Sequence, residues 1–164
     1  MILEKTEPQN KNWSIFFNAS LDYIEQNWGF DGKTRDQFRE EYKKELSIRI
    51  AQGQRLLYLS KTDDAYLGFV NAYLEDKGID NEKTLFIAEF CIFEQLRRRG
   101  YGEKMLQQLF RLPECSGIKY VAAEVDKDLS AANAFWKSQM TSLNDNGKRN
   151  LYWKYILPNT MKLS

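Results

Sequence analysis

A group of basic residues and glycines stands near the middle of the chain. Residues 97–102 read RRRGYG, three arginines followed by two glycines one residue apart. An apolar run with the length and aromatic content of a buried strand, residues 85–93, precedes them, and a helical pattern follows. Glycines let the backbone come close to a ligand, and the first turn of a helix offers N–H groups and positive dipole charge. This order predicts a cradle for phosphate; the alternative is a plain strand-to-helix connection with solvated arginines.

The chain contains no histidine, and this absence narrows the chemistry open to it. Ser-His-Asp and Cys-His catalysis are excluded. The common zinc sites are excluded as well, because they need histidine or a cysteine cluster. We therefore expect no metal, and any general base must be a carboxylate, a tyrosine, a lysine or a relayed water.

Length and charge predict a single domain over residues 1–164. The 24 basic residues balance 23 acidic ones, so no global field would attract nucleic acid. No apolar run approaches the roughly 20 residues of a membrane span, and the N-terminus lacks the pattern of a signal peptide. Cys91 and Cys115 are expected to be free thiols in a reducing compartment. These features predict a cytoplasmic protein that binds neither nucleic acid nor membrane.

Periodicity predicts seven strands and four helices. In chain order they are a strand at 1–5, helices at 11–27 and 34–53, strands at 55–61, 65–75 and 85–93, a helix after the glycines, a strand at 118–125, a helix at 129–140, and a hairpin of 140–143 with 150–157.

Several residues are expected to fix the ends and contacts of these elements. Thr34 and Gln37 form a capping-box arrangement at the start of the second helix, and Gly53 stops it. Gly68 marks a bulge or a close backbone approach within its strand. Ser130 is expected to cap the last helix, and the final hairpin is expected to turn at residues 144–147.

The pattern Arg97-x-x-Gly100-x-Gly102 resembles the pyrophosphate-binding signature of the GNAT superfamily, the acetyl-CoA-dependent N-acetyltransferases. Phe90 and Ile92 fit the apolar positions that lead into the turn, and the predicted order of elements matches the family's. The resemblance implies an α+β, three-layer fold. Its central sheet would be twisted, mostly antiparallel and seven-stranded, with four helices, and splayed between strands 4 and 5. The match is specific only over residues 85–136; the first eighty residues match by pattern.

Acetyl-CoA is the cosubstrate that this resemblance implies. The strand edge at residues 90–92 would meet the pantetheine arm and the thioester, with the N–H of Ile92 facing the carbonyl oxygen. The N–H groups of residues 98–103 would hold the pyrophosphate, and the arginine side chains would add charge. The expected cofactor-binding residues are Phe90, Ile92, Arg97, Arg98, Arg99, Gly100, Tyr101, Gly102, Glu103 and Asn133.

Glu89 is the candidate general base. It interrupts the apolar run and coincides with an acidic position that many small-amine-acetylating members of the family carry. A carboxylate within an apolar strand is expected to have a raised pKa, and it would also hold the ammonium of the acceptor by charge. Alternatively, Glu89 faces the wet side of the sheet or pairs with a lysine. Glu124, Asp126 and Asp128 are second choices for the base.

The last predicted helix departs from the family pattern. Members usually carry a tyrosine after the phenylalanine, and it protonates the leaving thiolate; here Trp136 follows Phe135. An indole N–H donates a hydrogen bond but is far too weak an acid to give up its proton. Leu129 stands where the family has an asparagine, and nearby Asn133 would take over a contact to the pantetheine. The remaining candidate proton donors are water, Tyr101, Tyr120 and Tyr152.

The resemblance implies that an acetyl group moves from acetyl-CoA to a primary amine of a small molecule or peptide, by direct attack in a ternary complex. Trp28, Phe30 and Asp31, between the first two helices, are candidates for the acceptor wall. Equally, these aromatic residues clamp the two helices together. The sequence leaves open whether the chain forms a homodimer.

Two rival interpretations keep part of this pattern. A CoA-binding module without catalysis, with a sensing or regulatory role, is favoured by Trp136. A nucleic-acid binder would use the three arginines with Tyr101 and Phe93 as stacking groups, although the balanced charge argues against it.

Overall fold

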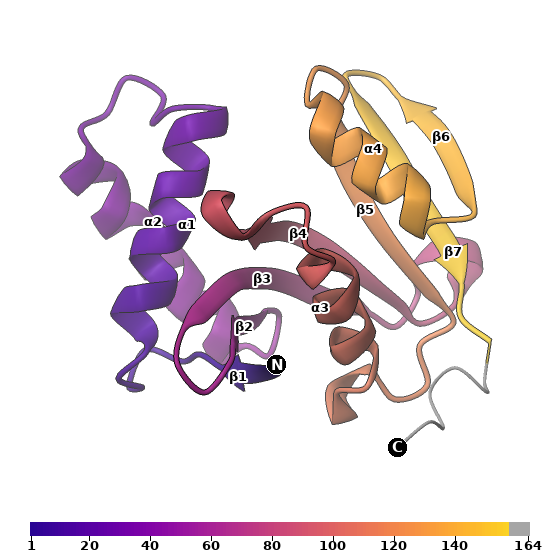
Figure 1. The fold of residues 1–164 in the computed structure, drawn as a ribbon, viewed down its shortest axis with the longest axis horizontal. Helices are drawn as coiled ribbons and strands as arrows, with labels where there is room; N and C mark the ends of the chain where they lie inside the picture. The colour runs from indigo at the N-terminus through magenta and orange to yellow at the C-terminus, as the bar shows by residue number, and fades with distance from the viewer. Residues whose placement is uncertain (158–164) are drawn as a thin grey trace. The chain divides into compact units, whose positions relative to one another are not determined.

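The computed structural model describes residues 1–157, which form seven strands and four α-helices in the predicted order (Figure 1). The strands are β1 (Ile2–Lys5), β2 (Leu56–Lys61), β3 (Tyr66–Glu75), β4 (Thr84–Ile92), β5 (Tyr120–Asp126), β6 (Ser142–Asn146) and β7 (Arg149–Tyr155). The helices are α1 (Trp13–Asn27), α2 (Arg35–Ala51), α3 (Tyr101–Phe110) and α4 (Ser130–Gln139).

The seven described strands follow the order β1-β2-β3-β4-β5-β7-β6. Strands β4 and β5 are parallel, with residues 84–87 paired to residues 120–123, and both strands run on beyond the paired residues. The pairs β1–β2, β5–β7 and β6–β7 are antiparallel. The α+β fold with its mixed seven-stranded sheet and four helices, expected from the sequence, is confirmed.

The chain divides into two compact units that exchange segments within β3, β4 and α3. The first unit consists of Met1–Asn71 and Glu89–Met105. The second consists of Ala72–Ala88 and the described residues from Leu106 onward. The first unit therefore holds both the Glu89 end of β4 and the glycine-bearing turn.

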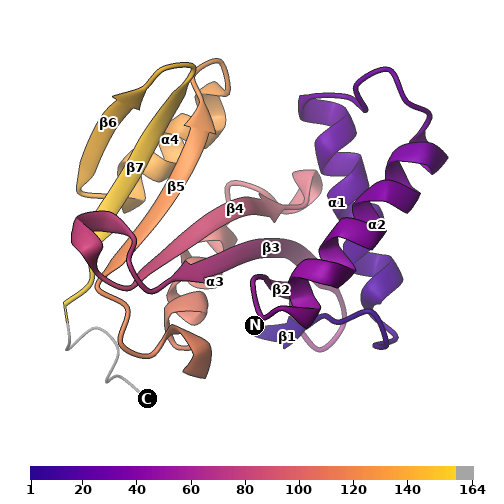
Figure 2. The same cartoon turned by 180° about the vertical axis from the view of Figure 1, so that it is seen from behind.

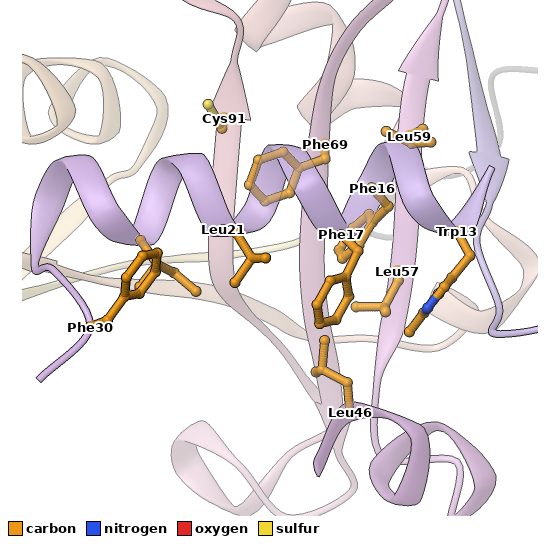
Figure 3. Packing of buried hydrophobic residues seen from close by; sticks show 11 residues of the cluster. Trp13, Phe16, Phe17, Leu21, Phe30, Leu46, Leu57, Leu59, Phe69 and Cys91 are labelled. Carbon is orange, nitrogen blue, oxygen red and sulfur yellow. The ribbon is translucent and has the colours of Figure 1, made fainter. Parts of the chain in front are cut away.

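The core of the first unit forms where α1 packs against β2 and β3 (Figure 3). Trp13, Phe16 and Phe17 recur at helical spacing with Leu21 and Ile24, so one stripe of α1 is apolar and buried. Figure 3 shows the rings of Phe16 and Phe17 among strand residues such as Leu57 and Phe69, with Leu46 of α2 next to Phe17. Helix α1 is thereby held flat on the sheet.

Helix α2 lies beside α1 in both views (Figures 1 and 2), and the predicted capping box is present at its start. The N–H of Gln37 donates to the Thr34 hydroxyl at 3.2 Å, and the N–H of Thr34 donates to the Gln37 side chain at 3.0 Å. Gly53 follows the helix with φ +69°, as expected for its stop.

In the second unit, α4 lies along one face of β5 and β7 (Figures 1 and 2). The antiparallel register joins Tyr120 to Tyr155 and continues to the pair Asp126 and Arg149. Buried side chains of β5 include Val121, Ala123 and Val125, so this strand is apolar on alternate positions over its length.

Two predictions of local structure were wrong. Ser130 is the first residue of α4 and does not cap it; Leu129 precedes the helix, without a side-chain capping bond. Strand β6 extends to Asn146 and pairs it with Arg149, so the turn consists of Gly147 and Lys148, and residues 144–146, expected within the turn, belong to the strand. Gly147 takes φ +70°, which a two-residue turn favours and a side chain would strain.

Candidate active site

The turn between β4 and α3 presents a run of backbone N–H groups. The first α-helical bond of this segment runs from the N–H of Lys104 to the carbonyl of Gly100, at 3.3 Å. The N–H groups of residues 98–103 therefore precede the helical bonding pattern, where a helix leaves donors for an external acceptor. Arg98 has φ +65° and Gly100 has φ +80°, and these left-handed residues bend the chain at the turn.

This turn fits an anionic group. A Cβ added at Gly100 would meet open space, so the backbone is approachable there. Arg98 and Arg99 are exposed, and the positive end of α3 lies beside them. A diphosphate placed there would be held by the N–H groups of residues 98–103. The predicted residues Tyr101, Gly102 and Glu103 form the first turn of α3.

Arg97 braces the turn. Its Nε donates to the carbonyl oxygen of Ile92 at 2.8 Å, and its Nη2 lies 3.9 Å from the Cys91 sulfur. The side chain thus ties the turn back to the end of β4. Sequence reasoning assigned all three arginines the same role, whereas the structure separates Arg97 from the other two.

Strand β4 is held close to β3 just before this turn. A Cβ on Gly68 would lie 2.1 Å from the carbonyl oxygen of Cys91, so only glycine fits. The N–H of Phe93 also donates to the carbonyl of Leu67, at 2.9 Å. The predicted close backbone approach at Gly68 is confirmed, and it fixes the position of residues 90–92.

Glu89 lies on β4 beneath the two N-terminal helices. The hydroxyl of Tyr42, from α2, donates to its Oε1 at 2.9 Å, and the hydroxyl of Ser20, from α1, donates to its Oε2 at 2.9 Å. The Asn71 side chain of β3 also bonds the carboxylate, and Arg55 contributes a positive charge nearby. Three elements therefore converge on one carboxylate.

Burial raises the pKa of the Glu89 carboxyl above its ordinary value of 4.5. The hydrogen bonds from Tyr42, Ser20 and Asn71 and the charge of Arg55 act in the opposite direction without cancelling the effect of burial on this pKa. The raised pKa predicted from the apolar strand is thus confirmed. A carboxylate with a raised pKa, held by neutral donors, is a suitable proton acceptor.

The other predicted residues of β4 lie on either side of Glu89. Phe90 and Ile92 are half-buried. Because side chains alternate along a strand, they point to the face opposite Glu89 and the buried Cys91. Burial raises the pKa of the Cys91 thiol. Both Cys91 and Cys115 are free and buried.

The segment between α1 and α2 serves mainly to join the helices. Phe30 is buried and packs on Phe38 of α2, with ring centroids 4.9 Å apart. Trp28 contacts Tyr23 of α1 edge-on at 5.5 Å, yet 48% of its surface is exposed. Asp31 is exposed with φ +55°. Phe30 therefore holds the two helices together, as the alternative interpretation expected, whereas Trp28 has a surface that a ligand can reach.

In the second unit, Asn133 is engaged by its own surroundings. Its Nδ2 donates to the carbonyls of Asp126 and Leu129 at 2.9 and 2.8 Å. Its Oδ1 accepts from Asn150 at 3.0 Å and from the Tyr152 hydroxyl at 2.7 Å. An amide side chain offers two donors and two lone pairs, so the whole capacity of Asn133 is used.

The remaining candidates of the second unit are also engaged. Trp136 is buried and stacks edge-on with Phe135, at 5.0 Å. Arg149 bonds Asp126 at 2.8 Å and approaches Glu124 at 3.6 Å. Asp128, by contrast, is exposed, and the bond that it accepts from the N–H of Ser130, at 3.1 Å, goes to its backbone carbonyl and not to its carboxylate. The Tyr120 hydroxyl donates to Asp80 at 2.7 Å, which raises the pKa of the tyrosine.

Sequence reasoning missed the residues that surround Glu89. Ser20 lies on the otherwise apolar stripe of α1 and is fully buried, and Asn71 is a buried amide within an apolar stretch of β3. A polar residue on a buried face is a detectable signal, because it needs a hydrogen-bonding partner. Tyr42 packs against the apolar core of the first unit, and nothing in the sequence indicates the partner of its hydroxyl.

A profile described as the Acetyltransferase (GNAT) family matches residues 18–140. L-2,4-diaminobutyric acid acetyltransferase of Halalkalibacterium halodurans is 24% identical over 86 residues, 52% of this chain and 44% of that protein. This chain thus spans less than half the length of that relative.

Solved structures with similar folds include the PaiA N-acetyltransferase of Thermoplasma acidophilum in complex with coenzyme A. Its TM-score is 0.71 at 13% identity, covering 95% of this chain and 100% of that one. The Salmonella typhimurium acetyltransferase that modifies the N-terminal serine of ribosomal protein L7/L12 also has a similar fold. Its TM-score is 0.67 at 17% sequence identity, and the match covers 95% of this chain and 96% of that one.

Two further observations bear on the class of protein. Within residues 1–157, no helix combines the length and apolar character needed to cross a bilayer. The family profile covers well over half of the chain, including Glu89 and the whole glycine-bearing turn. The chain belongs to the GNAT family of acetyltransferases.

Proposed function

We propose that this protein is an N-acetyltransferase that moves an acetyl group from acetyl-CoA to a primary amine by direct attack in a ternary complex. The observation that carries the proposal is the run of N–H groups at residues 98–103, placed directly after the strand that holds Glu89. The coenzyme A in the structure of the Thermoplasma relative supports the choice of cosubstrate.

In this proposal the glycine-bearing turn holds the pyrophosphate. The N–H groups of residues 98–103 donate to its oxygens, and Arg98 and Arg99 add charge. The edge of β4 at Phe90 and Ile92 lies along the pantetheine arm, with the N–H of Ile92 polarising the thioester carbonyl. Arg97 contributes by shaping the turn. Asn133 is left out because its hydrogen bonds are used within its own unit.

Glu89 is proposed to accept the proton that the acceptor ammonium must lose before it can attack. The neutral amine then forms the new C–N bond at the thioester carbon, and the C–S bond breaks as the thiolate leaves. The second amine proton is released as the amide forms, and the thiolate takes up a proton from solvent. Trp136 cannot supply that proton, because an indole N–H is not acidic enough.

The acceptor is proposed to be a cation before it reacts. A carboxylate at Glu89 attracts an ammonium group, and the exposed face of Trp28 offers a cation–π contact at the surface of the same unit. Small diamines, amino acids and protein N-termini all present such a group. The relatives' printed substrates, a diaminobutyric acid and an N-terminal serine, fall in this class.

The proposal is tested by measuring free thiol release from acetyl-CoA across a panel of amines, with calorimetry of coenzyme A binding alongside. We expect turnover with at least one amine, and Glu89→Gln should lower kcat at least tenfold without changing the affinity for coenzyme A. Binding of coenzyme A with unchanged turnover in Glu89→Gln would remove Glu89 from the mechanism. If no heat accompanies addition of coenzyme A, the acetyltransferase proposal is wrong.

A second candidate function rests on Trp136, which stands where the family usually has its acid. In that case the protein binds acetyl-CoA and senses it without transferring the acetyl group. The same assay separates the two functions: heat of binding with no thiol release from any amine favours the sensor. A thiol with a pKa near 8.5 is a tolerable leaving group as thiolate, and for this reason we favour the enzyme.

A further inference from the structure

The side chain of Glu89 is fixed from two helices at once. Tyr42 holds Oε1 and Ser20 holds Oε2, each at 2.9 Å, and the two hydroxyl oxygens lie 3.4 Å apart. Ser20 is fully buried, and Tyr42 is partly buried against the apolar core of the first unit. Both oxygens of the carboxylate are therefore engaged, and its plane is set by α1 and α2 together.

The orientation of the carboxylate decides how a further donor would meet it. An ionised carboxylate has about four lone-pair positions. Tyr42, Ser20 and Asn71 donate to it, and Arg55 adds its charge nearby. In the proposed reaction the N–H of an acceptor amine, or of a water that relays its proton, would donate to the same carboxylate. A carboxylate whose plane turned freely would not present its oxygens to that donor in one direction.

The phenol of Tyr42 is suited to act as a donor only. Burial and the neighbouring Glu89 raise its pKa, so the hydroxyl stays neutral and keeps its proton. Its ring is packed between Phe17 and Phe38, with centroids 5.5 and 5.7 Å away, which fixes where the hydroxyl points. A phenol with a raised pKa is a weaker acid than an ordinary tyrosine, which argues against Tyr42 as the missing acid.

We propose that Tyr42 is a positioning residue for the acetyl-transfer reaction: its hydroxyl, together with that of Ser20, holds the Glu89 carboxylate in the orientation that receives the amine proton. This role rests on the proposed function and adds residues of α1 and α2 to the surroundings of Glu89, which the sequence did not identify. Removal of the phenol hydroxyl takes away a donor that favours the carboxylate form. Glu89 then binds its proton more tightly and becomes a base only at higher pH.

The groups that face Glu89 come from every element packed against it. They are Ser20 of α1, Tyr42 of α2, Arg55 just before β2, Asn71 of β3, and Cys91 on β4 itself. Of these, Arg55 stays charged and Tyr42 stays neutral across the range in which Glu89 titrates. Burial raises the pKa of the Cys91 thiol, so it stays protonated there. A pH profile of the reaction at acidic to neutral pH therefore reports on Glu89.

The test uses Tyr42→Phe, which keeps the ring packing and removes only the hydroxyl. Tyr66→Phe is the matched control, because the Tyr66 hydroxyl donates to a different carboxylate of the same unit, Glu4, at 3.4 Å. Two quantities are measured in the full chain. The first is the titration of the ¹³C-labelled Glu89 carboxyl by NMR, assigned by its loss in Glu89→Gln. The second is the pH dependence of kcat and of kcat/KM.

We expect the Glu89 titration to move to higher pH in Tyr42→Phe and to stay unchanged in Tyr66→Phe. At neutral pH kcat should fall about tenfold, with the KM for acetyl-CoA unchanged, and the acidic limb of the rate profile should move with the titration. Ser20→Ala should move the Glu89 titration and the acidic limb of the rate profile in the same direction. A purely structural role would lower the amount of folded enzyme without shifting the limb.

Failure of this inference is distinguishable from failure of the proposed function. If wild type and Glu89→Gln behave as expected but Tyr42→Phe keeps the wild-type titration or the wild-type rate profile, the positioning role is overturned and the acetyltransferase stands. If the wild type transfers acetyl to no amine, the proposed function is wrong. The positioning role then falls with it, whatever the titration shows.

Discussion

Arg97 and Arg99 are two residues apart, yet their side chains have different surroundings. Arg97 donates to the carbonyl of Ile92 within its own turn, whereas Arg99 is exposed beside the start of α3. An arginine that holds the backbone acts on the shape of the turn. An exposed arginine beside the same N–H groups acts through its charge.

We predict that Arg99→Ala weakens coenzyme A binding about tenfold and leaves the free energy of unfolding unchanged. Arg97→Ala should weaken binding and also lower the free energy of unfolding, by about 1 kcal/mol, because the bond to Ile92 is lost. Calorimetry and urea denaturation measure the two quantities. Arg111→Ala, an exposed arginine just after α3, is the control and should change neither. Equal stability loss in the Arg97 and Arg99 variants would contradict this division of roles.

The sequence located Glu89 and its raised pKa, because one charge within an apolar run is a visible signal. It could not identify the donors, since Ser20 and Tyr42 are 69 and 47 residues away from it along the chain. Asn133 shows the opposite case. Its place near the start of a helix suggested a ligand contact, but four hydrogen bonds within the second unit use its whole amide.

At the scale of elements, periodicity predicted the strands and the α-helices of the described chain, because apolar residues recur at intervals of two or of three to four. The details that failed lie at the ends of elements. Ser130 looked like a cap, yet Leu129 takes the capping position without a side-chain capping bond, and the N–H of Ser130 donates to the Asp128 carbonyl at 3.1 Å. The final turn shifted because Trp153 donates to Asn144 at 2.6 Å, within a ladder that extends β6 to Asn146.

Gly68 carries a prediction about the contact between β3 and β4. In Gly68→Ala the new Cβ would meet the Cys91 carbonyl oxygen at 2.1 Å, and backbone atoms cannot move aside cheaply. We expect the free energy of unfolding to fall by about 2–4 kcal/mol. Binding of coenzyme A should weaken too, because residues 90–92 must shift.

Gly53→Ala is the comparison for this variant. Gly53 has φ +69° but open space around it, so alanine there costs only backbone strain, about 1 kcal/mol. Urea denaturation of both variants separates the two effects. If Gly68→Ala loses no more stability than Gly53→Ala, the close approach of the two strands is not what requires glycine at position 68.

At the scale of the whole molecule, the absence of histidine makes the pH dependence of stability unusually simple to interpret. Between pH 5 and 8 histidine is the side chain that ordinarily titrates, and this chain has none. Hydrogen bonds from Lys61 and Asn12 lower the pKa of Glu4, and a hydrogen bond from Lys127 lowers that of Asp145, so the effect of both carboxylates on stability is confined to acid. Burial raises the pKa of Cys91 and raises that of Cys115 to about 12. Both thiols therefore change the free energy of unfolding only at alkaline pH.

Burial raises the pKa of Glu89, so this carboxyl titrates differently in the folded and the unfolded chain. In the folded chain its pKa lies above the ordinary 4.5, so between the two values the folded state binds more protons than the unfolded state. Its contribution to stability is therefore full below about pH 4.5 and is lost as pH rises through the folded pKa. Each unit of difference between the two pKa values corresponds to about 1.4 kcal/mol.

We predict that the free energy of unfolding of the wild type falls as the pH rises from about 4.5 through the folded pKa of Glu89, and that Glu89→Gln removes most of this slope. Glutamine keeps the size of the side chain and cannot ionise, so the proton-linked term disappears while the packing remains. Urea denaturation at matched ionic strength measures the slope, with Glu40→Gln, an exposed carboxylate on α2, as the control that should retain it. A slope that survives in Glu89→Gln would mean that another group titrates on unfolding and that Glu89 is not the buried acid of this fold.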